Sequence, residues 1–428
     1  MKVLMFGWEF PPHISGGLGT ACYGLTKGLT KLGGIEILFV VPKAYGDEDQ
    51  QTARLIGANE ISMGDQSVDY RKFLKKIHFI EVNSRLVPYT SPEEYEKLSE
   101  SEHTENKQFI NTRLGGKFEF SGGYGAGLFQ EISNYAIVAS RIGKTFDFDV
   151  IHAHDWLTYP AGMAAKYISG KPLIIHVHAT DFDRSGGSVN PGVFDIEKRG
   201  MEAADAIVAV SNLTRNTVIN NYGINPEKVV TVYNAVEPMS DLESFGKLKN
   251  AHDKVVTFLG RVTLQKGPEY FIEAAHRVLQ KMKNVRFVMA GSGELLVNSI
   301  HRIAELRIGD RFHFTGFLKG DDVKKMFALS DVYVMPSVSE PFGISPLEAM
   351  QSNVPVIISH QSGVSEILKH AIKIDFWDIE AMADAIYGIL NYPGLPKYFR
   401  KYGRSEVDNL KWENTAAKMR DIYISFNH

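Results

Sequence analysis

The chain has 428 residues, 44% of them hydrophobic and 23% charged, so it is long enough for two domains of ordinary size and shows no bias toward disorder. A net charge of -3 and an isoelectric point near 6.5 exclude binding of nucleic acid through bulk positive charge. The one cysteine, Cys22, excludes an internal disulfide and a thiolate zinc site, which favours a reducing compartment and a cytoplasmic location.

The N-terminal run KVLMFGWEFPP is apolar only briefly and then carries an acid and two prolines, which is typical of a first buried strand rather than a signal peptide. No apolar run approaches the roughly 20 residues that span a bilayer. We therefore expect no transmembrane segment, and any membrane contact would be peripheral.

Short apolar runs rich in β-branched residues alternate with longer amphipathic segments along the whole chain, which is the pattern of βαβ units around parallel sheets. The predicted strands of the first half are 3–8, 36–42, 77–82, 149–156, 173–179, 206–211 and 229–235. Those of the second half are 255–262, 285–293, 311–317, 331–337, 354–359 and 371–375. The pattern predicts an α/β fold of two Rossmann-like domains that face a central cleft.

The segment 237–254 is polar and has no long apolar run, so we place a hinge linker there. The resulting domains are 1–240 and 241–408, and a C-terminal helix at about 409–428 would pack back on the first domain. The polar, glycine-rich segment 83–127 is interpreted as an excursion from the first domain that could form a flap over the cleft.

The glycines at Gly16, Gly17 and Gly19 lie between the first strand and a helix expected to begin near Thr20. Small residues there let backbone amides approach an anion at the helix N-terminus. The third glycine of the dinucleotide fingerprint is replaced by Cys22, so this is not that motif. A donor contact and a plain tight turn are equal alternatives here.

Two predicted strands carry paired histidines, and the period of two puts each pair on one face of its strand. Ligands of open α/β sheets bind beyond the carboxyl ends of the strands, so His154, Asp155 and His178 are well placed. For His152 and His176, a hydrogen-bonded core position is the simpler interpretation. A metal-hydrolase site built from the two pairs is an alternative that leaves the second domain unexplained.

The tripeptide DFD occurs twice, at 147–149 and 181–183, and resembles the DxD cation motif of glycosyltransferases of another fold. The first copy precedes its strand, at the edge away from the cleft. The second is better placed, but hydrogen bonding by Asp181 needs no metal. We therefore assign neither copy to a metal.

The first strand of the second half ends in GRVTLQKG, which places Arg261 and Lys266 in the loop at its carboxyl end. Two cations there could clamp a diphosphate and stabilise the charge that develops as it leaves. Taken alone, such a pair is more often ordinary surface charge.

A second loop, VSEPFGISPLEAM, carries Glu340 and, eight positions later, Glu348 in a helix expected to start near Gly343. The amides that follow the glycine, at Ile344 and Ser345, would face a diphosphate, while Glu348 accepts the hydroxyls of a ribose. Glu340 could then hold sugar hydroxyls. The glycine turn that begins at Gly291 lies at the same sheet edge.

Together these motifs resemble the retaining glycosyltransferases of the GT-B fold, namely family four with the starch and glycogen synthases. The resemblance covers nearly the whole chain and rests on nine segments in the family's order: WEFPPHISGGLG, HAHDW, VHATD, NAVE, GRVTLQKG, AGSGE, TGF, SEPFGISPLE and SGVSE.

The resemblance implies that Arg261 and Lys266 bind the donor diphosphate, that Glu348 binds the ribose and that Glu340 binds the transferred hexose. It also implies that His178 reaches the sugar from the first domain, with Asp155 near the acceptor. The other expected donor contacts are Gly16, Gly17, Asn234, Gly291, Phe317, Gly343, Ile344 and Ser345.

The implied reaction moves a hexose, with glucose the first candidate, from UDP- or ADP-glucose to a glycan with retention and without a metal or other cofactor. HAHDW is typical of starch and glycogen synthases, which favours extension of an α-1,4-glucan. Those enzymes usually carry lysine where this chain has Ile14, so transfer to a lipid, a small sugar or an envelope glycan is the alternative. A third class, a non-catalytic sugar-binding protein or an epimerase, stays open.

Overall fold

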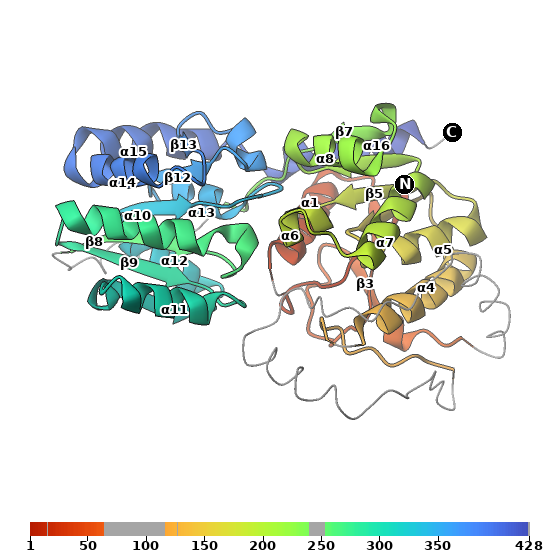
Figure 1. Ribbon diagram of the computed structural model, residues 1–428. Coiled ribbons are helices and arrows are strands. Elements are labelled where there is room, and N and C mark those ends of the chain that lie inside the picture. The colour runs from red at the N-terminus through yellow and green to blue at the C-terminus, as the bar shows by residue number, and fades with distance from the viewer. Residues whose placement is uncertain (15, 64–115, 126, 239–252, 427–428) are drawn as a thin grey trace, which may run out of the picture.

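A computed structural model describes residues 1–14, 16–63, 116–125, 127–238 and 253–426, and it divides into two lobes (Figure 1). Each lobe is built around one parallel sheet covered by helices on both faces. The predicted α/β fold of two Rossmann-like domains is confirmed. The predicted strand 77–82 lies outside the described residues, as do most of the linker 237–254 and most of the excursion 83–127.

The first lobe has seven parallel strands in the order β3-β2-β1-β4-β5-β6-β7. Its elements are β1 (Lys2–Phe6), α1 (Gly17–Leu32), β2 (Glu36–Val41), β3 (Arg54–Gly57), η1 (Ala58–Glu60), α4 (Leu128–Thr145), β4 (Val150–His154), α5 (Tyr159–Ser169), β5 (Leu173–Val177), α6 (Asp181–Ser185), α7 (Pro191–Ala203), β6 (Ala206–Ala209), α8 (Asn212–Tyr222), η3 (Pro226–Lys228) and β7 (Val229–Thr231).

The second lobe has six parallel strands in the order β10-β9-β8-β11-β12-β13. Its elements are β8 (Lys254–Leu259), η5 (Leu264–Lys266), α10 (Pro268–Lys281), β9 (Val285–Ala290), α11 (Leu296–Glu305), η6 (Gly309–Arg311), β10 (Phe312–Gly316), α12 (Asp321–Leu329), β11 (Val332–Met335), α13 (Ser345–Gln351), β12 (Val356–Ser359), η7 (Gly363–Glu366), β13 (Ile372–Ile374), α14 (Ile379–Asn391) and α15 (Gly394–Val407).

Both strand orders reverse once, between β1 and β4 in the first sheet and between β8 and β11 in the second. At such a point the loops leave toward opposite faces, and the crevice between them is where open α/β sheets bind ligands. The loops that leave β1, β4, β8 and β11 carry most of the predicted site residues. Topology therefore gathers these residues at the two switch points.

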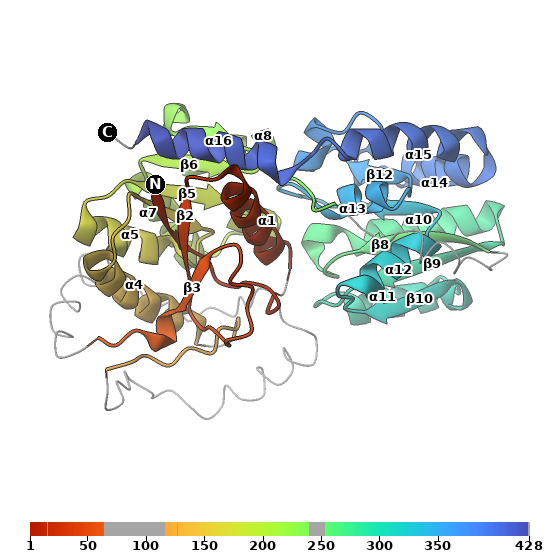
Figure 2. The ribbon, with the colours of Figure 1, turned by 180° about the vertical axis from the view of Figure 1, so that it is seen from behind.

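The last helix, α16 (Trp412–Ser425), returns to the first lobe and packs against α1 (Figure 2). Trp412 is buried and lies so close to Gly24 that a β-carbon there would meet its ring at 2.2 Å. Where the chain crosses back, the N–H of Val236 donates to the carbonyl of Leu410 at 3.4 Å. The two crossings between the lobes thus run side by side.

Local sequence signals set the helix ends in the first lobe. The side chain of Asn190 accepts hydrogen bonds from two amides in the first turn of α7, and that of Ser211 accepts one from the amide of Thr214 in α8. Helices α5 and α8 end at Gly170 and Gly223, which both adopt φ of 70°, a conformation that glycine adopts without strain. These boundaries fix where the neighbouring strands and their loops begin.

Two local predictions need correction. Strand β3 is absent from the predicted strands, because its four residues follow a polar stretch and carry little apolar signal. Helix α1 begins at Gly17 rather than near Thr20, so the glycines form its first turn instead of a loop before it.

Candidate functional site

The ammonium of Lys266 lies in direct contact with the carboxylate of Glu340, 74 residues further along the chain. Lys266 ends η5, after β8, and Glu340 follows β11, so the contact spans the switch point of the second sheet. The side chains are 20% and 9% exposed. Two groups predicted from separate motifs thus form one part-buried ion pair.

Arg261 leaves β8 at the same edge, and its guanidinium donates to Gln265 at 2.9 Å. Gln265 is buried, and its carbonyl accepts from the N–H of Val338 at 2.9 Å, which ties η5 to the loop of Glu340. The two predicted cations therefore stand on one short segment that is fixed to the loop after β11.

The backbone of Glu340 is held on both sides by the loop after β12. Its N–H donates to Gln361 at 2.9 Å, and its carbonyl accepts from Gly363 at 2.8 Å. Gly343 has φ of 97°, which favours glycine, and a β-carbon there would lie 3.2 Å from the side chain of Glu340. The carboxylate is consequently aimed by a rigid loop.

The helix of this motif begins at Ser345, with Ile344 as its N-cap, rather than near Gly343. Glu348 lies on its first turn, and burial raises the pKa of that carboxyl to about 7. Ser345 is hydrogen-bonded at 2.9 Å to the hydroxyl of Tyr333, a buried residue of β11 that the sequence analysis did not select.

The carboxyl ends of β8 and β9 meet backbone to backbone through glycine. A β-carbon at Gly291 would lie 1.8 Å from the carbonyl of Gly260, and one at Gly293 would lie 2.5 Å from that of Val262. No side chain fits these contacts. Gly291 was predicted to contact the donor, but the close packing of the two strand ends is by itself a sufficient reason for a glycine there.

Three further predicted donor contacts lie in different surroundings. Phe317, after β10, is 53% exposed and has the ammonium of Lys319 5.4 Å from its ring centre. Asn234 is buried beside the crossing from the first lobe. Ile344 is part-buried and packs against core residues of both lobes. Their contacts with a donor stay predictions.

In the first lobe, Gly16 is the N-cap of α1 and Gly17 its first residue. The adjacent amide of Gly19 donates at 3.2 Å to the carboxylate of Glu9, which also accepts from Tyr124 at 3.2 Å. Glu9 is only 7% exposed, and it places negative charge at the helix N-terminus. Glu9 is not among the predicted site residues, although an acid inside an apolar run was a usable signal.

Four histidines form one stack at the ends of β4 and β5: His152, His154 and His176 are buried, and His178, just after β5, is part-buried. His154 and His176 are paired in the register of the two strands, and His154 Nδ1 lies 3.0 Å from His178 Nε2. Burial lowers the pKa of His178 to about 3, so its imidazole is neutral near pH 7. The predicted same-face pairing of His152 with His154 is confirmed, since their ring centres are 4.1 Å apart.

Nitrogen atoms of His152, His154 and His176 lie within 4.8 Å of one another, while the ring of His176 is nearly parallel to the other two. Zinc bound by nitrogens at about 2.0–2.1 Å needs those nitrogens roughly 3.3 Å apart. The three nitrogens are therefore close enough together to be candidate metal ligands, and the metal-hydrolase alternative stays a prediction.

Asp155 follows β4 with φ of 60°, which is uncommon for a residue with a side chain. Its carboxylate accepts from the amides of His178 at 2.7 Å and Ala179 at 3.2 Å, and it is 3% exposed. Burial raises the pKa of this carboxyl to about 6. The expected place of Asp155 is near the acceptor, but the structure directs its carboxylate to the backbone that carries His178.

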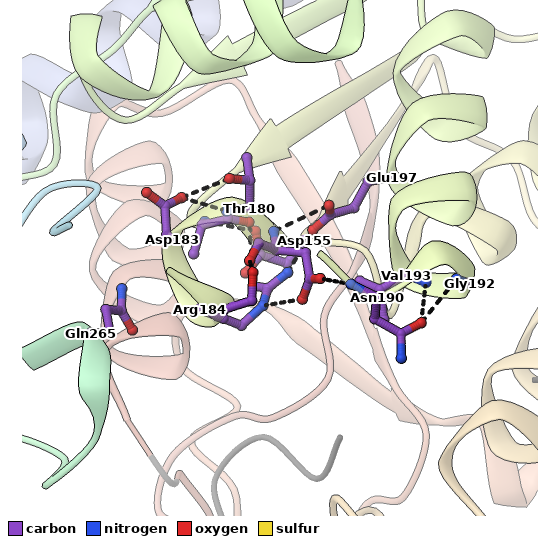
Figure 3. Close-up of polar contacts among 12 residues, drawn as sticks. Asp155, Thr180, Asp183, Arg184, Asn190, Gly192, Val193, Glu197 and Gln265 are labelled. Atoms are coloured by element: carbon purple, nitrogen blue, oxygen red, sulfur yellow. Dashed lines mark hydrogen bonds and ion pairs between the residues drawn. The ribbon is translucent and has the colours of Figure 1, made fainter. Parts of the chain in front are cut away.

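Figure 3 shows the polar network beneath the same loop. Arg184 donates to Glu197 at 2.5 Å and lies 3.7 Å from Asp181, with all three side chains at most 9% exposed. Asp181 accepts from the amide of Asn190 at 2.6 Å. Burial raises the pKa of Glu197 to about 7. The network joins α6 to α7 and supports the segment after β5.

The first DFD motif lies at the opposite edge of the sheet, where Asp147 and Asp149 bind the side chain and the amide of Lys2 at 2.8 and 2.7 Å. In the second motif, Asp183 accepts from the amide and hydroxyl of Thr180, both at 2.8 Å. The carboxylates have protein partners in both copies.

Comparison with family models identifies both halves of the chain. Residues 116–239 match the model "Glycosyltransferase Family 4", and residues 240–406 match "Glycosyl transferases group 1". Together the two matches cover residues 116–406, so the chain carries the glycosyltransferase domains that these models describe, in a GT-B fold. The first match contains the histidine stack, and the second contains the ion pair of Lys266 with Glu340.

Several relatives align with most of this glycosyltransferase. An uncharacterized glycosyltransferase of Methanocaldococcus jannaschii is 27% identical over 99% of this chain and 98% of its own. A glycogen synthase of Mycobacterium tuberculosis is 21% identical over 99% and 95%. An alpha-maltose-1-phosphate synthase of Mycolicibacterium smegmatis is 28% identical over 64% and 78%.

Solved structures share the fold at low sequence identity. HepE of Anabaena, solved with UDP and glucose, has a TM-score of 0.67 at 16% identity and covers 99% of this chain and 100% of its own. Sucrose-phosphate synthase of Thermosynechococcus elongatus has a TM-score of 0.71 at 18% identity over 99% and 98%. Within the part of the chain that the structure describes, no helix is long and apolar enough to cross a bilayer.

Proposed function

We propose that this glycosyltransferase moves a hexose, with glucose the first candidate, from a nucleotide diphosphate sugar to a glycan acceptor, with retention at the anomeric carbon. The observation that carries the proposal is the contact of Lys266 with Glu340 at the switch point of the second sheet. It brings together a cation for a leaving phosphate and a carboxylate for sugar hydroxyls. Because the hexose of a nucleotide sugar is bonded to its diphosphate, a donor site needs these two groups at neighbouring positions.

On the donor side, Arg261 and Lys266 would stabilise the diphosphate as the sugar–phosphate bond breaks, which is the kind of interaction that lowers a barrier most. The carboxylate of Glu348, whose pKa burial raises to about 7, would accept the ribose hydroxyls. The exposed ring of Phe317 is available to the nucleotide base. The UDP-bound fold relatives support a nucleotide donor.

The acceptor hydroxyl would attack on the face that the nucleotide leaves, and the departing phosphate would help to take its proton. This route needs no carboxylate nucleophile and no metal. The neutral imidazole of His178 would contact the sugar from the first lobe, where exclusion of water limits hydrolysis. Asp155 would act indirectly, by holding the backbone of His178.

For the acceptor we propose an α-1,4-glucan, because the glycogen synthase relative aligns over nearly the full length of both chains. One observation favours a smaller acceptor instead. Ile14 covers the glycine turn, since a β-carbon at Gly19 would lie 2.5 Å from its side chain. Relatives named for a maltose phosphate and for inositol 3-phosphate are also more similar in sequence, at 28% and 26%.

The test is a panel of UDP-, ADP- and GDP-sugars, each incubated with glycogen, with maltose, with glucose 1-phosphate or with no acceptor, while released nucleotide and product anomers are measured. Glucan extension from UDP- or ADP-glucose would support the proposal, and turnover with glucose 1-phosphate alone would move it to the smaller acceptor. The absence of turnover with every donor would overturn it. Activity lost to a chelator and restored by a divalent ion would contradict the metal-free mechanism.

A further inference from the structure

A hydrogen bond crosses between the lobes directly beside the proposed donor site. The hydroxyl of Ser339 donates to the carboxylate of Asp183 at 2.5 Å. Ser339 belongs to the loop after β11, immediately before Glu340, and Asp183 belongs to α6 in the first lobe. The bond therefore connects the two loops that carry the predicted sugar contacts.

Each end of this bond is fixed within its own lobe. The second carboxylate oxygen of Asp183 accepts from the amide and the hydroxyl of Thr180, two residues after His178. On the other side, Val338 donates to the carbonyl of Gln265, beside Lys266. A displacement of Ser339 thus also moves the neighbouring Glu340. A displacement of Asp183 likewise moves Thr180 and the chain segment that carries His178.

A second contact lies next to the first. A β-carbon at Gly186, which ends α6, would lie 3.0 Å from the side chain of Leu264 in η5. Helix α6 therefore touches both elements that supply the ion pair of Lys266 and Glu340. Other inter-lobe bonds, from Asn212, Leu213 and Tyr233 to the carboxylate of Glu366, lie at α8 and η7 instead.

We propose that Asp183 is a positioning residue whose bond to Ser339 sets the spacing between Glu340 and His178, so that a donor hexose is held from both lobes at once. The inference rests on the proposed function. Asp183 does not touch the substrate; it fixes the loop that does. A charge-assisted bond at a part-buried position suits this role, because it is directional and is strengthened when water leaves the cleft.

The test replaces Ser339 by alanine, which removes the crossing bond and leaves the cap on Thr180 intact. We expect kcat for transfer to fall roughly tenfold, because hydrogen bonds to charged groups contribute about that factor. The dissociation constant of the nucleoside diphosphate should stay within about twofold, since Arg261, Lys266 and Glu348, the groups proposed to bind its phosphates and ribose, all lie in the second lobe. The fraction of donor lost to hydrolysis should rise severalfold, because the sugar is then open to water.

A comparison of Ser339→Thr with Ser339→Val separates the hydroxyl from side-chain volume and serves also if the alanine variant folds poorly. Ser339→Thr should recover most of the transfer rate, while Ser339→Val should not. Ser405→Ala, an exposed change on α15 in the same lobe, is the control and should match the unaltered chain. Equal transfer rates and hydrolysis fractions for the threonine and valine variants would overturn the proposal.

If the proposed function itself is wrong, the result differs from that of a wrong role for Asp183. The unaltered chain then turns over no nucleotide sugar, so the variants cannot differ in turnover. Small-angle scattering then tests the bond itself: added UDP or ADP should compact the unaltered chain more than the Ser339→Val variant. Identical scattering changes in both would overturn the role of the bond, whatever the reaction.

Discussion

The hydroxyl of Tyr423 in α16 lies 2.7 Å from Nδ1 of His152 in β4, although 271 residues separate them in the chain. Both side chains are fully buried. The last helix thus contributes the polar partner for one end of the histidine stack, whose other end, His178, lies just beyond the carboxyl end of β5.

Tyr423→Phe should lower stability by about 1–3 kcal/mol, because it leaves a buried ring nitrogen without a partner. Urea denaturation at pH 7.5 measures the loss. Tyr392→Phe, on a tyrosine that is 57% exposed, removes the same hydroxyl from the surface and should change little. Equal midpoints for the two variants would contradict the assigned bond.

The pH dependence of stability should carry the signature of His176. Burial holds the pKa of this imidazole well below its ordinary value, and neither ring nitrogen has a hydrogen-bond partner among the residues that the structure describes. Below about pH 6.5 this histidine binds a proton in the unfolded chain but stays neutral in the folded chain. The free energy of unfolding is therefore unaffected by this histidine above that pH and decreases as pH falls below it.

His176→Leu removes this contribution. From pH 7.5 to 5.0, the stability of the unaltered chain relative to the variant should decrease by about 2 kcal/mol. Urea denaturation at the two pH values gives the number. His301→Leu, on an exposed histidine of α11, should show a much smaller change. A relative stability independent of pH would show that His176 takes up its proton over the same pH range in the folded chain as in the unfolded chain.

Arg184→Met should destabilise the first lobe by about 3–5 kcal/mol, because it leaves the carboxylates of Asp181 and Glu197 buried without their cation. Arg199→Met breaks the more exposed pair with Asp195 on the neighbouring helix and should cost less than about 1 kcal/mol. Thermal melting of both variants provides the comparison. Similar losses of stability in the two variants would mean that the buried contacts of Arg184 contribute no more than the exposed pair of Arg199 with Asp195.

Lys266→Ala and Glu340→Ala should each reduce donor turnover by roughly 10²–10³-fold with the fold retained. Because the two groups are in contact, the double variant should lose much less than the product of the single losses. Nucleotide release from the preferred donor measures all three, with Lys281→Ala as an exposed control. Independent, multiplicative losses would show that the pair does not act as a unit.

The fold could be predicted because both sheets are parallel and buried, so their strands are near-continuous apolar runs. Strand β3 lacked that signal. The helix starts at Gly17 and Ser345 were misplaced by two or three residues, since glycine and proline near a helix end suit a loop equally well.

The sequence motifs indicated candidate site residues one by one, but not which of their side chains touch. Motifs indicated Lys266 and Glu340 separately, yet their contact depends on the order of β8 and β11 in the sheet. The same holds for Asp155, whose sequence position suggested a cleft residue and whose backbone conformation turns the carboxylate inward. Glu9 lies in the family segment WEFPPHISGGLG, but it was not selected as a site residue.

The paired crossings between the lobes also limit how the molecule can move. Because residues near Val236 and Leu410 pass side by side and are bonded to each other, a cut in either crossing would leave the lobes tethered by the other. Two adjacent tethers permit rotation about the line between them but resist twisting and sliding. Any relative motion of the lobes should therefore follow a single angular coordinate, and the bond of Ser339 to Asp183 must break when they separate.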